Sequence, residues 1–151
     1  MRKVFIFVVL FVLGCGQEKI HEYQVNMLAD DMKKAVEERD ADKLHALFSE
    51  DAFIEVTFPK EMGGTKQLPL NRYIDDIRKG WSMGIDQTYE IKDLQIEISD
   101  NHSTAYITDT VVEEASYNGN KIASAETSEK IEVIMIDGKP KIKSLYAVVK
   151  M

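Results

Sequence analysis

The period of the hydrophobic pattern changes near Asp86, and this change limits the fold more than any other feature. Before Asp86 apolar residues recur at helical spacing, whereas from Leu94 to Ile98 they alternate with polar residues, as in a half-buried strand. Further strands follow, and Asn118-Gly119 is a dipeptide typical of a tight turn between antiparallel strands. Helices followed by hairpin-connected strands predict an α+β domain, with the helices packed on one face of a single antiparallel sheet.

The segment before this change predicts three helices and one strand. Apolar residues in 25–36 follow helical spacing, and Asp40 is placed to cap a short second helix over 41–48. Aromatic and β-branched residues dominate 53–58, which favours a strand. The third helix ends near two glycines, and its expected core-facing side carries four residues, Tyr73, Ile74, Ile77 and Trp81.

The segment after the change predicts the remaining strands and their turns. Besides the strand that contains Leu94, strands are expected over 105–117, 122–136 and 142–149. Asp100-Asn101-His102 and Asp137-Gly138 are the expected turns at the two remaining connections. No repeat or internal linker interrupts this part of the chain, so it is expected to form one domain with the helices.

The composition excludes several classes of protein. The chain has 151 residues, 44% of them hydrophobic and 30% charged, which excludes a disordered polymer and suits one compact domain. Its single cysteine cannot form an internal disulfide. The 19 basic and 26 acidic side chains give a formal charge of −7, which provides no electrostatic attraction to nucleic acid. We therefore expect no nucleic-acid partner.

Residues 1–14 have the three parts of a secretory signal peptide, which are a basic start, a short apolar segment and a small residue. Arg2 and Lys3 precede ten consecutive apolar residues, Val4 to Leu13, and Gly14 follows. Ten residues in a helix rise about 15 Å, half of the roughly 30 Å hydrocarbon core of a bilayer. A permanent transmembrane helix is therefore not expected here.

Val12-Leu13-Gly14-Cys15 resembles the lipobox of bacterial lipoproteins, in which a small residue precedes the cysteine that becomes lipid-modified. The resemblance implies cleavage between Gly14 and Cys15, a diacylglycerol on the Cys15 thiol, and an acyl chain such as palmitate on the new amine. Two or more such chains suffice for stable anchoring in a membrane. The alternative is an ordinary signal peptide that happens to be followed by an unpaired cysteine.

These features divide the chain into a signal peptide (1–14), a lipidated cysteine with a short tether (15–24) and one domain (25–151). The protein is then expected to be exported and held by its lipid at the cell membrane or outer membrane, with the domain in the periplasm or outside the cell. Without residues 1–14 the chain keeps 17 basic and 26 acidic side chains, a formal charge of −9. Anionic lipid head groups would repel such a domain.

The segment from Asp40 to Ala52 resembles the signature of the SnoaL-like branch of the nuclear transport factor 2-like (NTF2-like) superfamily. That signature runs from a helix-capping Asp through Leu-Phe to Asp-Ala and a first strand. Asp100 to Ala105 and Asp137-Gly138-Lys139 are similar to later turns of the family, so the resemblance covers 25–149. It implies a strongly curved, cone-shaped sheet roofed by helices, often in a homodimer. Relatives use the enclosed cavity for isomerase, dehydratase or cyclase reactions, for ligand binding, or for docking a partner.

Pro140 departs from the family pattern, because many relatives carry an aromatic residue after the Asp-Gly turn. Proline has no amide hydrogen to donate and is confined to strand starts and edges. We therefore expect the last hairpin to begin pairing only after residue 140.

Acid–base chemistry in such a cavity requires titratable groups at inward-facing strand positions, kept from water so that their pKa values shift. Asp109 and Glu129 each share strand parity with apolar neighbours, which makes them candidate pocket residues. Trp81 and Tyr146 are candidates for an apolar wall and a hydroxyl donor. The alternative is that both acids lie at a solvated rim, because a register error of one residue turns them outward.

Other residues give weaker functional signals. The long loop expected over Pro59 to Pro69 would lie near the cavity mouth, where loops often carry function. His21, His45 and His102 fall in different elements with no second ligand at metal spacing, so no metal is expected. No phosphate-binding loop or dinucleotide fingerprint occurs, so no cofactor is expected.

Three functional hypotheses remain at this point. The first is a membrane-anchored envelope lipoprotein whose cavity binds a small apolar ligand or an envelope protein without catalysis. The second is a metal-independent isomerase or dehydratase that uses Asp109 or Glu129 as general base. The third is an assembly role at the membrane through the exposed sheet face. The fold alone does not choose among them.

Overall fold

A computed structural model describes residues 18–151, so the predicted signal peptide, Gly14 and Cys15 lie outside the described residues. The chain forms, in order, α1 (Glu22–Glu37), α2 (Ala41–Ala46), β1 (Phe48–Thr57), the 3-10 turn η1 (Lys60–Met62), β2 (Thr65–Leu68), α3 (Leu70–Trp81), β3 (Asp86–Ile98), β4 (Thr104–Tyr117), β5 (Asn120–Ile136) and β6 (Lys139–Lys150). None of the helices in this part of the chain is long and apolar enough to cross a membrane.

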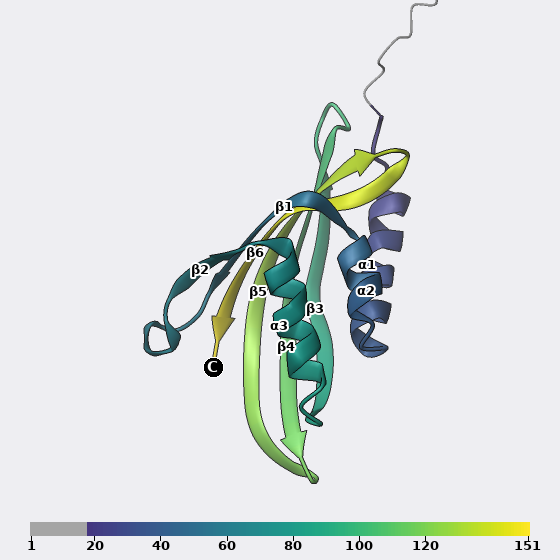
Figure 1. The fold of residues 1–151 in the computed structure, drawn as a ribbon. Coiled ribbons are helices and arrows are strands. Elements are labelled where there is room, and N and C mark those ends of the chain that lie inside the picture. Colours follow the sequence, from purple (N-terminus) through teal and green to yellow (C-terminus); the bar gives the residue numbers. More distant parts are fainter. Residues whose placement is uncertain (1–17) are drawn as a thin grey trace, which may run out of the picture.

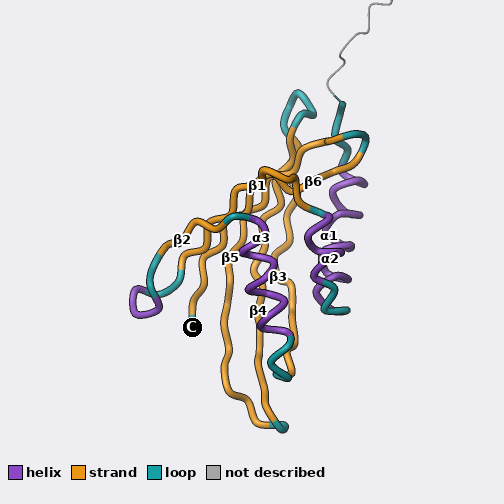
Figure 2. Tube along the Cα trace, viewed as in Figure 1, coloured by secondary structure: helices purple, strands orange, loops and turns teal. Residues whose placement is uncertain are grey.

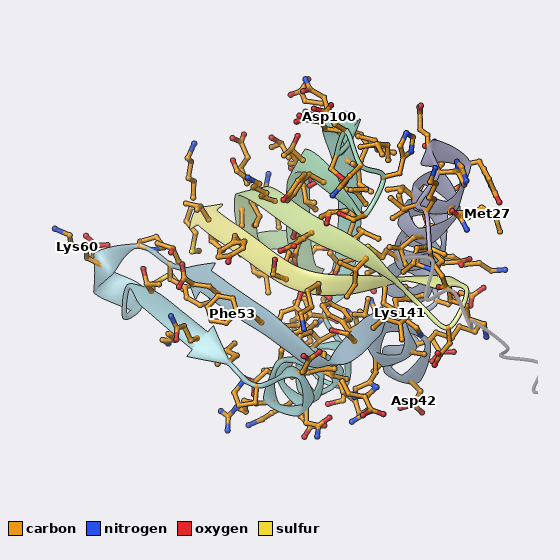
Figure 3. All side chains as sticks on the ribbon, turned by 90° about the horizontal axis from the view of Figure 1, so that it is seen from above. Met27, Asp42, Phe53, Lys60, Asp100 and Lys141 are labelled. Atoms are coloured by element: carbon orange, nitrogen blue, oxygen red, sulfur yellow. The ribbon has the colours of Figure 1, made fainter. Side chains whose placement is uncertain are left out.

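The strands form one sheet in the order β2-β1-β6-β5-β4-β3, and the three helices lie against one of its faces (Figures 1 and 2). The sheet bends strongly, and in the view from above α1 and α2 stand to one side of α3 (Figure 3). The predicted α+β architecture with a curved sheet is confirmed. The core lies between the helices and the sheet, and its largest fully buried side chains are Ile20, Val25, Ile54, Ile74, Ile107, Ile131, Val133 and Ile142.

Local sequence signals account for the helix ends and the tight turns. The Asp40 carboxylate caps α2 by accepting a hydrogen bond from the Lys43 amide at 2.9 Å, as predicted. Both central residues of the turn between β4 and β5 have positive φ, 50° at Asn118 and 76° at Gly119. This is the geometry of a two-residue turn that matches the twist of the flanking strands, and Asp137-Gly138 repeats it.

The first strand is longer than predicted, and one of its two strand pairs is parallel, whereas an antiparallel sheet was expected. β1 begins at Phe48, so the helix before it ends at Ala46. β1 also runs parallel to β6, with Phe53 opposite Ser144, whereas the other strand pairs are antiparallel. The chain can make this parallel pair because six elements and more than eighty residues separate the two strands.

The segment Pro59 to Pro69 is not the open loop that its glycines and prolines predicted. It contains η1 and β2, and β2 pairs antiparallel with β1, with Val56 opposite Lys66. β2 is an edge strand with little burial, so it lacks the apolar alternation by which sequence analysis finds strands. The segment is therefore an ordered arm of the sheet.

The expectation that pairing begins after Pro140 is wrong. Ile136 is opposite Lys139 and Met135 is opposite Pro140. In a two-residue hairpin the pair that flanks the turn exchanges hydrogen bonds and the next pair does not. Pro140 occupies that next position, where its missing amide hydrogen costs no bond to β5.

The domain begins earlier than residue 25. α1 starts at Glu22, and Ile20 is fully buried in the core. The Ile20 amide donates a hydrogen bond to the His102 carbonyl in the turn between β3 and β4. Most of the segment predicted to be a tether is therefore part of the folded domain.

Candidate functional site

Two acidic side chains lie on the face of the sheet that the helices cover, here called the inner face. They share this face because side chains alternate between the two faces along β4 and β5. Asp109 on β4 is directly opposite Glu129 on β5. One pair further along the same face, Ile107 is opposite Ile131, and both isoleucines are buried in the core. The structure thus brings together two of the predicted site residues as a cross-strand acid pair.

Burial controls the electrostatics of this pair. Burial, together with a smaller effect of the nearby Asp109 charge, raises the pKa of Glu129 to about 8. Burial also raises the pKa of Asp109 to about 6. The Asp109 Oδ1 atom is buried and has no hydrogen-bond partner among the described residues. An unpartnered acceptor of this kind needs a donor or a proton.

Helix α3 places an aromatic side chain, Tyr73, against the inner face of the sheet. The Tyr73 ring packs edge-on against Phe48 with the ring centroids 6.0 Å apart, which fixes its place between α3 and the sheet. Burial raises the pKa of the Tyr73 hydroxyl, and the charges of Glu129 and Tyr89 raise it further. The phenol therefore lies close to the acid pair and stays protonated.

A chain of hydrogen bonds extends from the end of α3 across the inner face. Trp81 Nε1 donates to the Tyr89 hydroxyl at 3.4 Å, and that hydroxyl donates to Gln87 Oε1 at 3.0 Å. Gln87 Nε2 in turn donates to Glu113 Oε1 at 2.7 Å. Burial raises the pKa of Glu113, while the bond from Gln87 acts in the opposite direction.

Of these four residues, Trp81 is the one that the sequence predicts as a pocket residue, whereas the adjacent acids Glu113-Glu114 suggest a solvated face. Glu113 has the same strand parity as Asp109, so its position was accessible from the pattern. Tyr89 lies opposite Glu113, but that pairing could not be found without the register of β3 and β4. The alternation of side chains along β4 that indicates Asp109 also indicates Glu113, which lies four residues further along the strand.

Tyr146 does not lie on the same face of the sheet as the acid pair. Its neighbours Leu145 and Ala147 are buried in the core, so strand alternation turns Tyr146 to the other side of the sheet, here called the outer face. There its ring lies 5.6 Å from that of Phe53, and both are partly exposed. Tyr146 therefore cannot contact the acid pair.

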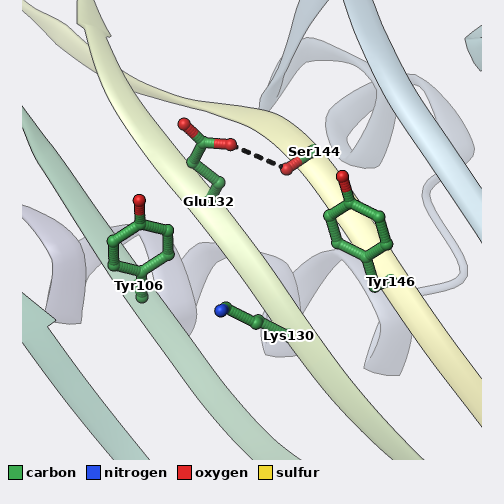
Figure 4. A pocket seen from close by; sticks show the side chains of 5 residues that line it. All are labelled: Tyr106, Lys130, Glu132, Ser144 and Tyr146. Carbon is green, nitrogen blue, oxygen red and sulfur yellow. Dashed lines mark hydrogen bonds between the residues drawn. The ribbon is translucent and has the colours of Figure 1, made fainter.

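The outer face has a shallow hollow of about 390 Å³, shown in Figure 4. Its lining residues are Tyr106, Lys130, Glu132, Ser144 and Tyr146. The Ser144 hydroxyl donates to Glu132 Oε2 at 3.0 Å, and the Lys130 ammonium lies 5.1 Å from the centre of the Tyr106 ring. The polar groups of this hollow thus already interact with one another.

The three histidines do not form a metal site in the described residues. His45 Nε2 lies 3.0 Å from Asn71 Oδ1, beside a hollow of about 370 Å³ between α2 and α3. The rings of His21 and His102 lie 6.1 Å apart, so the fold brings together two residues that are 81 positions apart. Within residues 18–151, no group of three or more His, Cys, Asp or Glu side chains could hold a metal ion.

Several solved structures of other proteins have the same fold as this chain. An NTF2-like protein from Cytophaga hutchinsonii superposes with a TM-score of 0.65 at 15% identity, over 87% of this chain and 100% of that one. A putative scytalone dehydratase from Novosphingobium aromaticivorans gives 0.63 at 16% identity, over 85% and 83%. The β subunit of benzoate 1,2-dioxygenase from Burkholderia mallei gives 0.69 at 13% identity, over 88% and 93%.

These similarities define the class of the domain, which has the NTF2-like fold. No family profile matches the chain. No curated protein matches its sequence. The similar structures include a dehydratase by name and a subunit of a dioxygenase, so the fold alone leaves the activity open.

Proposed function

We propose that this chain is an exported, lipid-anchored binding protein whose NTF2-like domain holds a small, largely apolar ligand against the inner face of its sheet. The observation that carries the proposal is the pair Asp109–Glu129, in which a buried carboxylate oxygen has no partner among the described residues. On one side of the pair the inner face is apolar, with Ile107 and Ile131 adjacent. A ligand with an apolar body and one hydrogen-bond donor suits this arrangement.

The energetic argument concerns the cost of the unpartnered oxygen. A buried polar group without a hydrogen bond costs about 1–3 kcal/mol, and a hydrogen bond to a charged group contributes about the same amount. A hydroxyl or amine of a ligand that reaches Asp109 Oδ1 therefore recovers free energy that the free protein lacks. The shape of the apolar surface then selects the rest of the ligand.

The protonation state of the pair also favours a donor ligand. With the pKa of Asp109 near 6 and that of Glu129 near 8, the pair holds about one proton at pH 7. It then presents one carboxylate that accepts hydrogen bonds and one carboxylic acid that can donate. A hydroxyl group can satisfy both partners at once.

A second candidate function is acid–base catalysis at the same pair. Carboxyl groups that titrate near neutral pH are suited to proton transfer, and one similar structure is named a putative scytalone dehydratase. Asp109 would then act as the general base, with no metal. An enzyme of this kind would also need a positive group to stabilise the anion that forms on the substrate. Among the described residues, no positively charged side chain contributes to the pKa shift of Asp109 or Glu129.

Native mass spectrometry of the full chain, purified from membranes in mild detergent, tests the binding proposal. We expect an adduct of defined mass that Asp109→Asn weakens and that Glu132→Gln, a matched change on the outer face, leaves intact. Absence of an adduct, together with no thermal shift from a panel of apolar alcohols and amines, would contradict ligand binding. Turnover of any of these compounds that Asp109→Asn abolishes would favour the enzyme instead.

A further inference from the structure

The first described residues of the chain are fastened to one end of the sheet. The Ile20 amide donates to the His102 carbonyl at 2.8 Å, and His102 Nδ1 lies 3.3 Å from the Ile20 carbonyl oxygen. The Glu18 carboxylate accepts a hydrogen bond from the Gly138 amide at 2.9 Å. Since the Ile20 side chain is fully buried as well, residues 18–20 form a clamp that two turns of the sheet hold.

Both of these turns lie at the same end of the molecule, here called the turn end. It consists of the β3–β4 turn (100–103) and the β5–β6 turn (137–138). The β4–β5 turn at Asn118-Gly119 lies at the opposite end, beyond the 14 residues of β4 (Figure 1). A strand of that length spans about 45 Å. The clamp therefore marks one end of a long molecule.

We propose that the turn end is the surface of the domain that faces the lipid bilayer. This inference rests on the proposed lipid anchor at Cys15, from which Glu18 is three residues away. Three residues reach about 11 Å when fully extended. Because the clamp fixes Glu18 to the sheet, the turn end is held within about that distance of the lipid head groups.

The charges at this end indicate that the covalent tether, not electrostatic attraction, sets the orientation. Glu18, Asp100 and Asp137 are exposed there, and Lys19 and Lys139 are the nearby basic residues. A surface with an excess of acids is not attracted to anionic lipids. The orientation is therefore expected to persist at high salt, where surface charges are screened.

This orientation determines how a ligand reaches the inner face. Asp109 and Glu129 lie part of the way along β4 and β5, farther from the bilayer than the two turns. The β4–β5 turn extends past the end of α3, away from the membrane side (Figure 1). The acid pair is then held away from the bilayer surface.

Depth-dependent fluorescence quenching of the lipidated full chain in phosphatidylcholine vesicles tests this inference. A fluorophore is attached to a cysteine introduced by Asp100→Cys at the turn end or by Asn120→Cys at the opposite end, and a quencher is carried on the lipid head groups. We expect severalfold stronger quenching at residue 100 than at residue 120, at low and at high salt. Equal quenching at the two positions would overturn the inference.

Two further variants separate the orientation from the anchor. A flexible insertion of about 12 residues between Gln17 and Glu18 spans tens of ångströms, so it is expected to remove the difference between the two labels. A difference that survives the insertion would show that tether length does not set the orientation. Cys15→Ser is expected to abolish lipid labelling and vesicle binding, and binding that survives this change would refute the anchor itself.

Discussion

The two faces of the sheet are built from alternate residues of the same strands, yet the burial and the hydrogen bonding of their acidic side chains differ. On the inner face burial raises the pKa of Asp109 and of Glu129. On the outer face Glu132 accepts a hydrogen bond from Ser144, and in β1 a hydrogen bond from Lys143 lowers the pKa of the exposed Asp51. The unpartnered Asp109 Oδ1 thus lies on the face where water is excluded, which is the place where a ligand gains most from donating a hydrogen bond to it.

The largest expected difference between the two faces concerns packing. Ile131→Ala should lower the free energy of unfolding by about 3 kcal/mol, because it leaves a cavity between the helices and the sheet. The neighbouring outer-face change Lys130→Ala should cost less than about 1 kcal/mol, since this side chain is exposed. Urea denaturation at pH 7 measures both, and similar losses would show that the two faces are not distinct.

A smaller effect is expected from the raised pKa of Glu129 on the inner face. Below about pH 4.5 Glu129 is protonated in both the folded and the unfolded chain, whereas between pH 4.5 and about 8 the folded chain alone keeps the proton. Stability should therefore fall as the pH rises through this range. Glu129→Gln should remove much of the fall and stabilise the protein at pH 9 by on the order of 2 kcal/mol.

Unfolding curves at several pH values check this expectation, with Glu132→Gln as the control on the outer face. The control should keep the pH dependence of the unchanged protein, because it leaves both Asp109 and Glu129 in place on the inner face. Loss of the pH dependence in the control variant, or its survival in Glu129→Gln, would contradict the difference between the faces.

The smallest effect is expected at the exposed ion pair. Lys143→Met removes the partner of Asp51, whose side chain is largely solvated. The change should leave the urea midpoint of unfolding nearly unchanged, because exposed pairs are screened by water and salt. A fall of the midpoint as large as that of Ile131→Ala would mean that this pair is as important as the packing of the inner face.

Local pattern was sufficient to predict the three helices, five of the six strands, the cap at Asp40 and the turn at Asn118-Gly119. Each depends on a few neighbouring residues and on steric preferences that act over one turn. Strand parity also placed Asp109 and Glu129 on one face, since side chains alternate along any strand. Parity could equally have excluded Tyr146, whose neighbours Leu145 and Ala147 are apolar.

Tertiary structure decided which strands are neighbours. It also decided where along a strand the alternation of inward and outward side chains shifts by one residue. The β1–β6 pair joins distant segments, and the edge strand β2 carries no apolar alternation to reveal it. In β3 a bulge at Asp93, where φ is 55°, leaves Leu94 exposed and turns both Tyr89 and Ile96 toward the residues of the inner face. Periodicity within one strand cannot show such a shift, because an extra residue is accommodated only when a partner strand fixes the register.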